Sequence, residues 1–216
     1  ARADADNNVG FEGHLAILFE FALKYGIPEI QVHVDQTNLP TEDGTERLVE
    51  ATKYLLARTP PEKRPHVWAV HMISPSGYEE DRFWALVQSL KTHNIGVVVC
   101  PHAALSMRQL RNSTGPMRNS IARVKELIAA GIEVRLGTDN INDIFMPDPK
   151  SPLILREAGP DFGIIQSATR FYDQGIWNKI MCGIRLNELD RYKVSESLKG
   201  DYNSAGTNAR PWLQIK

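Results

Sequence analysis

Four hydrophobic, β-branched runs of this sequence each end at or next to an ionisable side chain: residues 29–32 before His33, 67–70 before His71, 97–100 before His102, and 132–136 before Asp139. The strands of a parallel sheet are covered on both faces and read as continuous apolar runs, while their carboxyl ends open onto a ligand crevice. A polar side chain at such an end can face a substrate. The repetition therefore predicts a parallel sheet whose strand ends share one reaction centre.

Segments with helical periodicity alternate with these runs. Apolar side chains recur at helical spacing in four segments: 11–25, 46–58, 79–93 and 121–130. Gly26 and Gly131 stand directly after two of them, where a glycine commonly ends a helix. Four successive strand–helix units predict an α/β fold with right-handed crossovers, either a doubly wound sheet or part of a (β/α)8 barrel.

The alternation ends after Asp139. Three prolines between residues 147 and 152 interrupt the next stretch, and no fifth strand is predicted. Helices are expected at 162–172, 176–183 and 186–198, followed by an irregular tail from residue 200. We therefore expect β/α units over residues 1–146 and a C-terminal helical extension, packed on them, over residues 147–216.

The composition indicates no strong electrostatic partner. The 216 residues carry a net charge of -1, which leaves no large field to attract nucleic acid or anionic lipid. No apolar stretch of the sequence has the length of a membrane span, and two cysteines, Cys100 and Cys182, are too few for a disulfide framework. We therefore expect a cytoplasmic protein that binds small molecules, with no nucleic-acid partner and no membrane partner.

The side chains at the strand ends have the chemistry of a metal site. Neutral imidazole nitrogens and carboxylate oxygens are the ordinary ligands of zinc and of other first-row divalent ions. A bound ion of this kind makes water acidic enough to attack a substrate near neutral pH. Three imidazoles and one carboxylate at neighbouring strand ends therefore predict a metal-dependent hydrolase.

Two segments and one histidine carry a resemblance to a known family. They are Val32-His33-Val34-Asp35-Gln36, Gly131-Ile132-Glu133-Val134-Arg135-Leu136-Gly137-Thr138-Asp139-Asn140, and His71 at the end of its run. Together they resemble the second half of an amidohydrolase-superfamily barrel, nearest the cytosine deaminase branch, over most of residues 11–146. The resemblance implies a partial (β/α)8 TIM barrel made of strands five to eight, followed by the helical extension.

The resemblance also implies roles for three side chains. In that branch the histidine closing strand five binds the metal, and the histidine closing strand six polarises the attacking water or the substrate. The aspartate closing strand eight contacts the metal and shuttles a proton. Carried over by position, the implied metal ligands are His33 and Asp139, the implied catalytic residues are His71 and Asp139, and the implied ion is zinc or iron.

Two positions depart from the family's pattern. The family has a proton-carrying glutamate where this chain has Gln36, and it has a second, ring-gripping aspartate where this chain has Asn140. An amide cannot relay a proton, so we expect both residues to orient a substrate ring, in a changed substrate or mechanism. Asp35 is the second choice of proton carrier. His102, in a substrate-side loop, and Phe145 are expected to contact the substrate, although both also fit a structural role.

Part of the family's metal cage is missing from this sequence. The family takes two ligands from a His-x-His motif on strand one, and no His-x-His occurs here. His33 and Asp139 alone provide two ligands, whereas zinc sites take at least three from protein. Half a barrel would also expose sheet edges and an apolar interior. We therefore expect a fragment of a larger hydrolase, or a chain that pairs with a missing barrel half or with a second copy.

The sequence thus favours a metal-dependent hydrolase of carbon–nitrogen, non-peptide bonds, acting on a heterocyclic amine or amide. The alternative is a non-catalytic half-barrel, a subunit or small-molecule binding module that lacks the metal. A doubly wound nucleotide-binding domain fits less well, because the loop after the first strand, residues 36–39, contains no glycine to cradle a phosphate.

Overall fold

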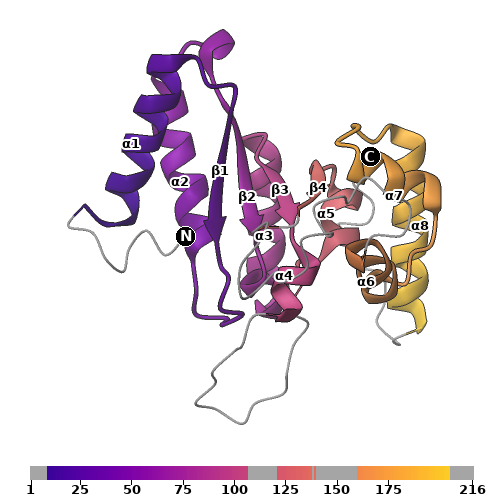
Figure 1. Cartoon of the computed structure of the whole chain (residues 1–216). Coiled ribbons are helices and arrows are strands. Elements are labelled where there is room, and N and C mark those ends of the chain that lie inside the picture. The colour runs from indigo at the N-terminus through magenta and orange to yellow at the C-terminus, as the bar shows by residue number, and fades with distance from the viewer. Residues whose placement is uncertain (1–8, 107–120, 138, 140–159, 205–216) are drawn as a thin grey trace.

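The computed structural model describes residues 9–106, 121–137, 139 and 160–204 (Figure 1). Its centre is a parallel sheet of four strands in the order β1-β2-β3-β4. In that order the strands span Glu29–Val34, His66–His71, Gly96–Val99 and Val134–Leu136. The predicted α/β class with a parallel sheet is thereby confirmed. The predicted boundary between residues 146 and 147 lies outside the described residues.

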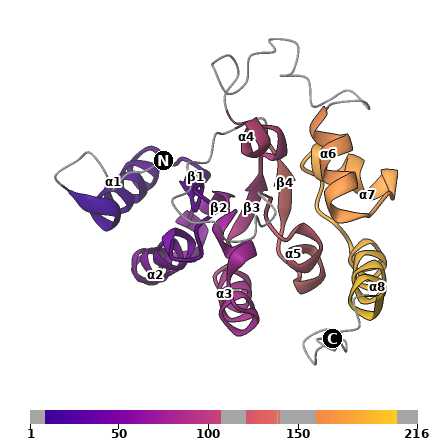
Figure 2. The same ribbon diagram turned by 90° about the horizontal axis from the view of Figure 1, so that it is seen from below.

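Four helices connect and flank these strands: α1 Gly10–Tyr25, α2 Gly44–Ala57, α3 Glu80–Thr92 and α5 Val124–Ala130. Figure 2 shows α2, α3 and α5 along one face of the sheet, with α1 beside α2 at the β1 edge. Gly26 and Gly131 cap α1 and α5 with φ of 62° and 95°, in the left-handed region that favours glycine.

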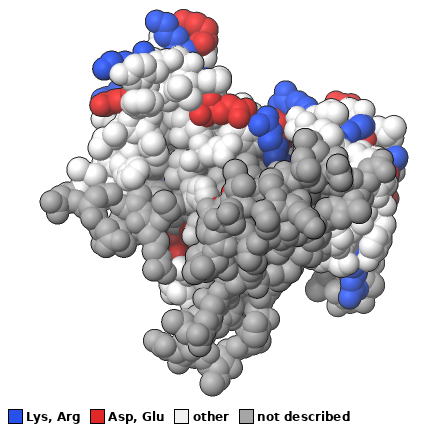
Figure 3. Space-filling model, viewed as in Figure 1, with Lys and Arg blue, Asp and Glu red and all other residues white. Residues whose placement is uncertain are grey.

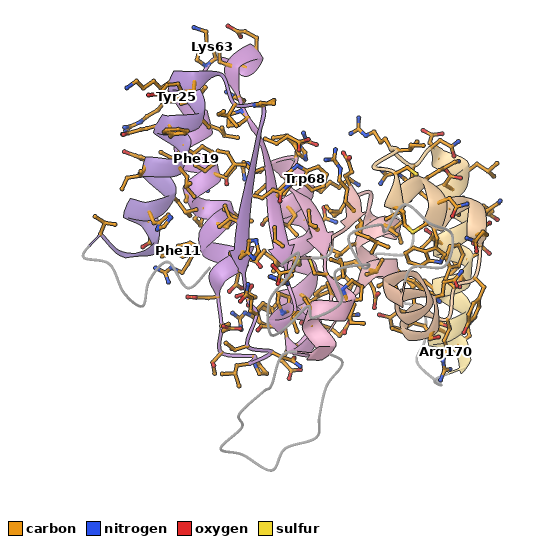
Figure 4. All side chains as sticks on the ribbon, in the orientation of Figure 1. Phe11, Phe19, Tyr25, Lys63, Trp68 and Arg170 are labelled. Carbon is orange, nitrogen blue, oxygen red and sulfur yellow. The ribbon has the colours of Figure 1, made fainter. Side chains whose placement is uncertain are left out.

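One hydrophobic core fills the space between these helices and the sheet. On β1 the buried side chains Ile30, Val32 and Val34 alternate with more exposed neighbours, as expected for a strand with one covered face. Phe11 and Phe19 of α1, labelled in Figure 4, belong to the same core. Burying one such side chain fully contributes about 1.5–3 kcal/mol, so this core is the main source of stability.

The inner face of the sheet, which we define as the face opposite to α2, α3 and α5, carries a second and smaller core. It comprises Trp68, Val70, Val98, Cys100 and Ala103. Trp68 is fully buried, and the guanidinium of Arg135 lies 4.0 Å from the centre of its ring. Nη1 of Arg135 also donates to Oε1 of Glu29 at 3.2 Å. Side chains from the two edge strands, β4 and β1, therefore meet across the inner face.

Three helices follow the sheet: α6 Pro160–Thr169, α7 Gln174–Met181 and α8 Glu188–Ser204. α7 packs against β4 and α8 packs against α5 (Figure 1). The prediction of an irregular tail from residue 200 was wrong for the last turn of α8. Lys125 donates to Asp201 at 2.5 Å and Arg123 donates to the hydroxyl of Tyr202 at 2.8 Å, so contacts with α5 hold that turn in helical form.

A short helix, α4 Pro101–Ser106, directly follows β3. The expectation of a loop here was wrong, because proline suits the first position of a helix and the alanines at 103 and 104 are strong helix formers. Two single 3₁₀ turns, η1 Pro61–Lys63 and η2 Ser74–Gly77, stand before and after β2. The second of these turns follows the strand end that carries His71.

No helix within the described ranges is both long and apolar enough to cross a bilayer. Figure 3 shows basic and acidic side chains intermixed along the upper rim of the visible face, over the amino-terminal ends of the strands. The mixture of signs agrees with the net charge of -1.

Gly96 provides a test of the packing on the inner face. A Cβ at this position would lie 2.3 Å from Cζ3 of Trp68, whose fully buried ring has no room to move aside. We expect Gly96→Ala to lower the free energy of unfolding by at least about 2 kcal/mol, measured by urea denaturation. The control is Gly200→Ala in α8, where a Cβ meets nothing within 4 Å. We expect this substitution to raise the free energy of unfolding by about 0.5–1 kcal/mol, because alanine is more stable than glycine inside a helix. Equal stability of Gly96→Ala and the unaltered chain would contradict this packing.

Candidate metal centre

His33 lies near the carboxyl end of β1 and projects from the inner face. Its Cα pairs with that of Val70 on β2, and paired residues of parallel strands point to the same side of the sheet. Val70 belongs to the inner core, so the strand alternation alone directs His33 to that face. The side chain is 35% exposed, which leaves part of the imidazole accessible from the carboxyl edge of the sheet.

His71 reaches the same place by a different route. It is the last residue of β2 and pairs with Val34, whose side chain is buried on the helix side of the sheet. Regular alternation would therefore send His71 away from His33. Its backbone instead adopts a left-handed conformation, with φ of 77°, which removes the side chain from the alternation. Such a conformation is uncommon for a bulky residue and costs about 1–3 kcal/mol, a cost typical of functional sites.

Asp139 follows β4, three positions after Leu136, and also has a left-handed backbone, with φ of 67°. Aspartate tolerates this region better than most residues, because its short side chain can bond local backbone groups. In a flat sheet the two edge strands would stand about 14 Å apart, too far for an aspartate and a histidine to touch. Contact between Asp139 and His33 therefore needs a sheet that curls so that its two edges approach each other.

The three side chains converge at the carboxyl end of the inner face. Nε2 of His71 lies 3.1 Å from Nδ1 of His33. The two carboxylate oxygens of Asp139 lie 3.7 Å from Nδ1 of His33 and 3.7 Å from Nε2 of His71. We refer to His33, His71 and Asp139 below as the strand-end cluster. Residues that are far apart in the sequence thus present three donor atoms to one point.

Burial fixes the protonation of the two imidazoles. Desolvation lowers the pKa of His33, against the attraction of Asp139. Desolvation, with the neighbouring His33 as a further cause, lowers the pKa of His71 to about 3. Nδ1 of His71 is buried with no hydrogen-bond partner among the described residues, while Nε2 faces two acceptors. The single proton of neutral His71 therefore belongs on Nε2, and Nδ1 of His33 is the acceptor that lies nearest to it.

The strand-end cluster fits a divalent metal ion. Ligand atoms about 2.0–2.2 Å from a tetrahedral ion stand about 3.3–3.6 Å from one another. One donor atom from each residue lies within 4.8 Å of the other two, and the closest pairs are separated by 3.1 and 3.7 Å. Burial lowers the pKa of both imidazoles and so favours the neutral form that metal ligation requires. The cluster therefore has the donor types, the charge and the spacing for zinc or a related ion.

Gln36 is the fourth polar side chain at this site. Its Nε2 lies 3.3 Å from Nδ1 of His33, so the amide shares that lone pair with His71. Asp35, the second choice of proton carrier, does not face the site. Its carboxylate accepts from the backbone N–H groups of Gly44 and Thr45 at 2.8 and 2.9 Å, at the start of α2. The expectation for Asp35 was wrong because the side chain is 5% exposed and bound to a helix terminus.

The other predicted substrate contacts are His102, Asn140 and Phe145. His102 lies in α4, directly after β3, in place of the expected loop. Asn140 and Phe145 lie outside the described residues. The structure brings His33, His71 and Asp139 together, as the strand-end pattern predicted. What the pattern did not predict is the backbone conformation that brings His71 there, because regular alternation along β2 would direct its side chain to the helix side of the sheet. A positive φ at a histidine leaves no signal in a hydrophobic pattern.

Comparison with known proteins supports the fold. No family model matches this sequence, and no curated protein matches it. Two crystal structures of the 5-methylcytosine deaminase from Klebsiella pneumoniae, liganded with 5-fluorocytosine and with phosphonocytosine, are similar to this chain. The sequence identities are 22% and 21%, the TM-scores are 0.54 and 0.55, and the similarity covers 88% and 85% of this chain. The chain spans only 42% and 41% of the deaminase chains.

The left-handed backbone of His71 can be tested with two truncations. His71→Gly and His71→Ala both remove the imidazole, but only alanine retains the strain of a Cβ at φ of 77°. We expect the glycine variant to be more stable than the alanine variant by about 1 kcal/mol in urea denaturation. The control is Ala69→Gly on the same strand, where regular backbone should make glycine the less stable residue by about 0.5–1 kcal/mol. The same order at both positions would refute the strained conformation.

Proposed function

We propose that this chain supplies strands five to eight of an amidohydrolase-type (β/α)8 barrel, and that the complete protein is a metal-dependent hydrolase. The proposed reaction breaks a carbon–nitrogen, non-peptide bond of a heterocyclic amine or amide, as in a deaminase. The strand-end cluster carries this proposal, because it joins two neutral imidazoles and a carboxylate at the edge of a parallel sheet where active sites lie. The similarity to a cytosine-type deaminase supports the same reaction class.

In this proposal His33 and Asp139 hold the ion, which is zinc or iron. When bound, such an ion supplies water that is acidic enough to attack near neutral pH. The sequence contains no His-x-His, so two further ligands come from outside this chain in the complete site. His71 is the third donor that this chain offers, and it stands within 3.7 Å of the carboxylate of Asp139.

The cluster also provides the groups that move protons during deamination. Water adds to the ring carbon that bears the amino group, and Asp139 accepts the proton that this water loses. Asp139 returns this proton to the amino nitrogen, and the C–N bond breaks so that the amine leaves as neutral ammonia. The second proton of the water passes from the hydroxyl oxygen to the ring nitrogen, which leaves a carbonyl on the ring. Neutral His71 donates its Nε2 proton in a hydrogen bond to the oxygen that gains charge. Its pKa, lowered to about 3 by burial, keeps it neutral throughout the physiological range.

Gln36 is a substrate-orienting residue in this proposal. It hydrogen-bonds to His33 and can orient a ring through its amide, but it cannot carry a proton. Asp139 is therefore the only proton carrier among the described residues of the cluster. Asn140, His102 and Phe145 complete the proposed substrate contacts. In this proposal the amide of Asn140 and the imidazole of His102 hydrogen-bond to polar atoms of the substrate ring, and Phe145 stacks on the face of that ring.

The chain also carries a surface that suits the missing part of the barrel. β1 is an edge strand, and α1 beside it exposes an apolar stripe. Ile17, Phe21 and Tyr25 are 55%, 57% and 57% exposed and recur at intervals of four residues along one side of that helix. We propose that the complementary barrel half, or a second copy of the chain, pairs with β1 and covers this stripe.

A non-catalytic half-barrel is the second candidate function. The absence of His-x-His from the sequence favours it, since the family's metal cage is then incomplete. This candidate keeps the crevice for a small molecule and requires no ion. Metal binding by the chain separates the two functions.

The metal test uses the full chain and Co²⁺, whose absorption reports its ligands. We expect about one bound equivalent and at least about 100-fold weaker binding in His33→Asn and in Asp139→Asn, more than the loss of an outer-shell partner causes. The matched control is His93→Asn at the end of α3, at the opposite edge of the sheet, where binding should be unchanged. A folded chain that binds no Co²⁺ would favour the non-catalytic half-barrel.

Turnover tests the role of Asp139 in the assembled enzyme. Asp139→Asn keeps the shape of the side chain but cannot accept a proton. We expect ammonia release from aminated heterocycles to fall by about 10²–10⁴-fold, the usual contribution of a positioned acid–base group, with little change in unfolding free energy. Unchanged turnover would remove Asp139 from the reaction.

A further inference from the structure

The carboxyl ends of β1 and β2 are joined by backbone hydrogen bonds that continue beyond the two strands. The N–H of Met72 donates to the carbonyl of Val34 at 3.3 Å. The N–H groups of Ile73 and Ser74 both donate to the carbonyl of Asp35 at 3.1 Å. Three consecutive N–H groups after His71 are therefore held by two carbonyls after His33. These bonds fix the path of the chain at the point where His71 takes its left-handed conformation.

The carbonyl of Asp35 accepts two N–H groups with its two lone pairs, and the backbone of Asp35 is left-handed, with φ of 55°. The side chain of Asp35 fixes that conformation through hydrogen bonds to the start of α2. The carboxylate accepts from Gly44 N at 2.8 Å, from Thr45 N at 2.9 Å and from the Thr45 hydroxyl at 2.5 Å. Charge-assisted bonds of this kind are stronger than neutral ones and are well placed at a helix N-terminus. One buried residue thus ties the start of α2 to the turn after β2.

Only glycine fits at position 44 beside this carboxylate. A Cβ at position 44 would lie 2.8 Å from Oδ1 of Asp35, closer than a side chain can approach. Any larger residue would therefore push the carboxylate away from the start of α2. The N-cap residue Asp43 makes no side-chain bond to the helix, so Asp35 fills that role from a distance.

We propose that Asp35 is a positioning residue for the strand-end cluster, because it holds the turn that directs the imidazole of His71 to His33. The inference rests on the proposed function, since it concerns the donor atoms of the same metal centre. Without the carboxylate of Asp35, the start of α2 no longer holds the backbone of residue 35, whose carbonyl binds the N–H groups of Ile73 and Ser74. The turn after β2 then shifts, and His71 relaxes toward the helix side of the sheet. The three donor atoms then no longer face one point.

The test compares two buried aspartates that bind helix termini. Asp190 is 6% exposed and accepts from Asn187 N at 3.1 Å at the start of α8, remote from the cluster. Asp35→Ala and Asp190→Ala should both lower the free energy of unfolding in urea. Only Asp35→Ala should weaken Co²⁺ binding, by about tenfold or more, and alter the Co²⁺ absorption bands. A stability loss shared by both variants with unchanged Co²⁺ affinity and absorption would reduce Asp35 to a helix cap and overturn the proposal.

A second measurement does not depend on the metal. The side chain of His71 is fully buried and should resist carbethoxylation by diethyl pyrocarbonate, as followed by mass spectrometry. We expect modification to become faster by about tenfold or more in Asp35→Ala, through local opening, and to stay slow in Asp190→Ala. If the unaltered chain binds no Co²⁺, the proposed function fails, and the rate of modification still decides the role of Asp35. Protection of His71 in both variants would overturn that role.

Two milder variants cover the case in which Asp35→Ala does not fold. Asp35→Asn keeps one acceptor oxygen and the tolerance for a left-handed backbone, and should show a smaller change of the same kind. Gly44→Ala leaves Asp35 in place but displaces its carboxylate, and should reproduce the Asp35→Ala effects on Co²⁺ and His71. Its control, Gly200→Ala, adds a methyl group in open space. Unaltered Co²⁺ binding and unaltered protection of His71 in Gly44→Ala would contradict the proposal.

Discussion

The site depends on contact between the two edge strands of the sheet across its inner face. At the amino-terminal end, Arg135 of β4 reaches Glu29 of β1 above the ring of Trp68. At the carboxyl end, Asp139 after β4 reaches His33 of β1. Both pairs join residues 106 positions apart in the sequence. The curl that brings the two edge strands together thus allows the Arg135–Glu29 contact at one end of the sheet and the Asp139–His33 contact at the other. A flat sheet of the same strands would have neither contact.

The second requirement is a set of unfavourable backbone conformations at the strand ends. Asp35, His71, Met72 and Asp139 all have positive φ, and all of them follow or end β1, β2 or β4 at the same edge of the sheet. Each conformation costs about 1–3 kcal/mol and persists only where surrounding contacts fix it. The bonds from Asp35 to α2 and to the turn after β2 supply such contacts. The strained residues therefore lie at the strand ends, where side chains of the cluster depart from the regular alternation of a strand. The geometry of the site is thus obtained at a cost in folding stability.

The sequence predicted the parallel sheet, the helices that connect and flank its strands, and the strand ends that carry His33, His71 and Asp139. Burial imposes periods of two residues on strands and 3.6 residues on helices, and these periods are visible in the pattern of apolar residues. It failed where contacts distant in sequence decide the local structure. The last turn of α8 continues past residue 200 because Lys125 and Arg123 bind it, and neither lies near it in the chain. The direction of His71 follows from a carbonyl of another strand. Such contacts have no periodic signature.

The position of His71 also decides how many ligands this chain can offer. As a hydrogen-bond donor to the substrate oxygen, His71 keeps its proton on Nε2; as a metal ligand, it must free the lone pair of that nitrogen. One atom cannot do both. With two further ligands from a complementary half, the metal needs only His33 and Asp139, and His71 is free to donate. Without them, the three residues of the strand-end cluster match the number of protein ligands at catalytic zinc sites. In our proposal, the complementary half thus converts His71 from a ligand into a catalytic residue, which makes assembly of the barrel a requirement for turnover.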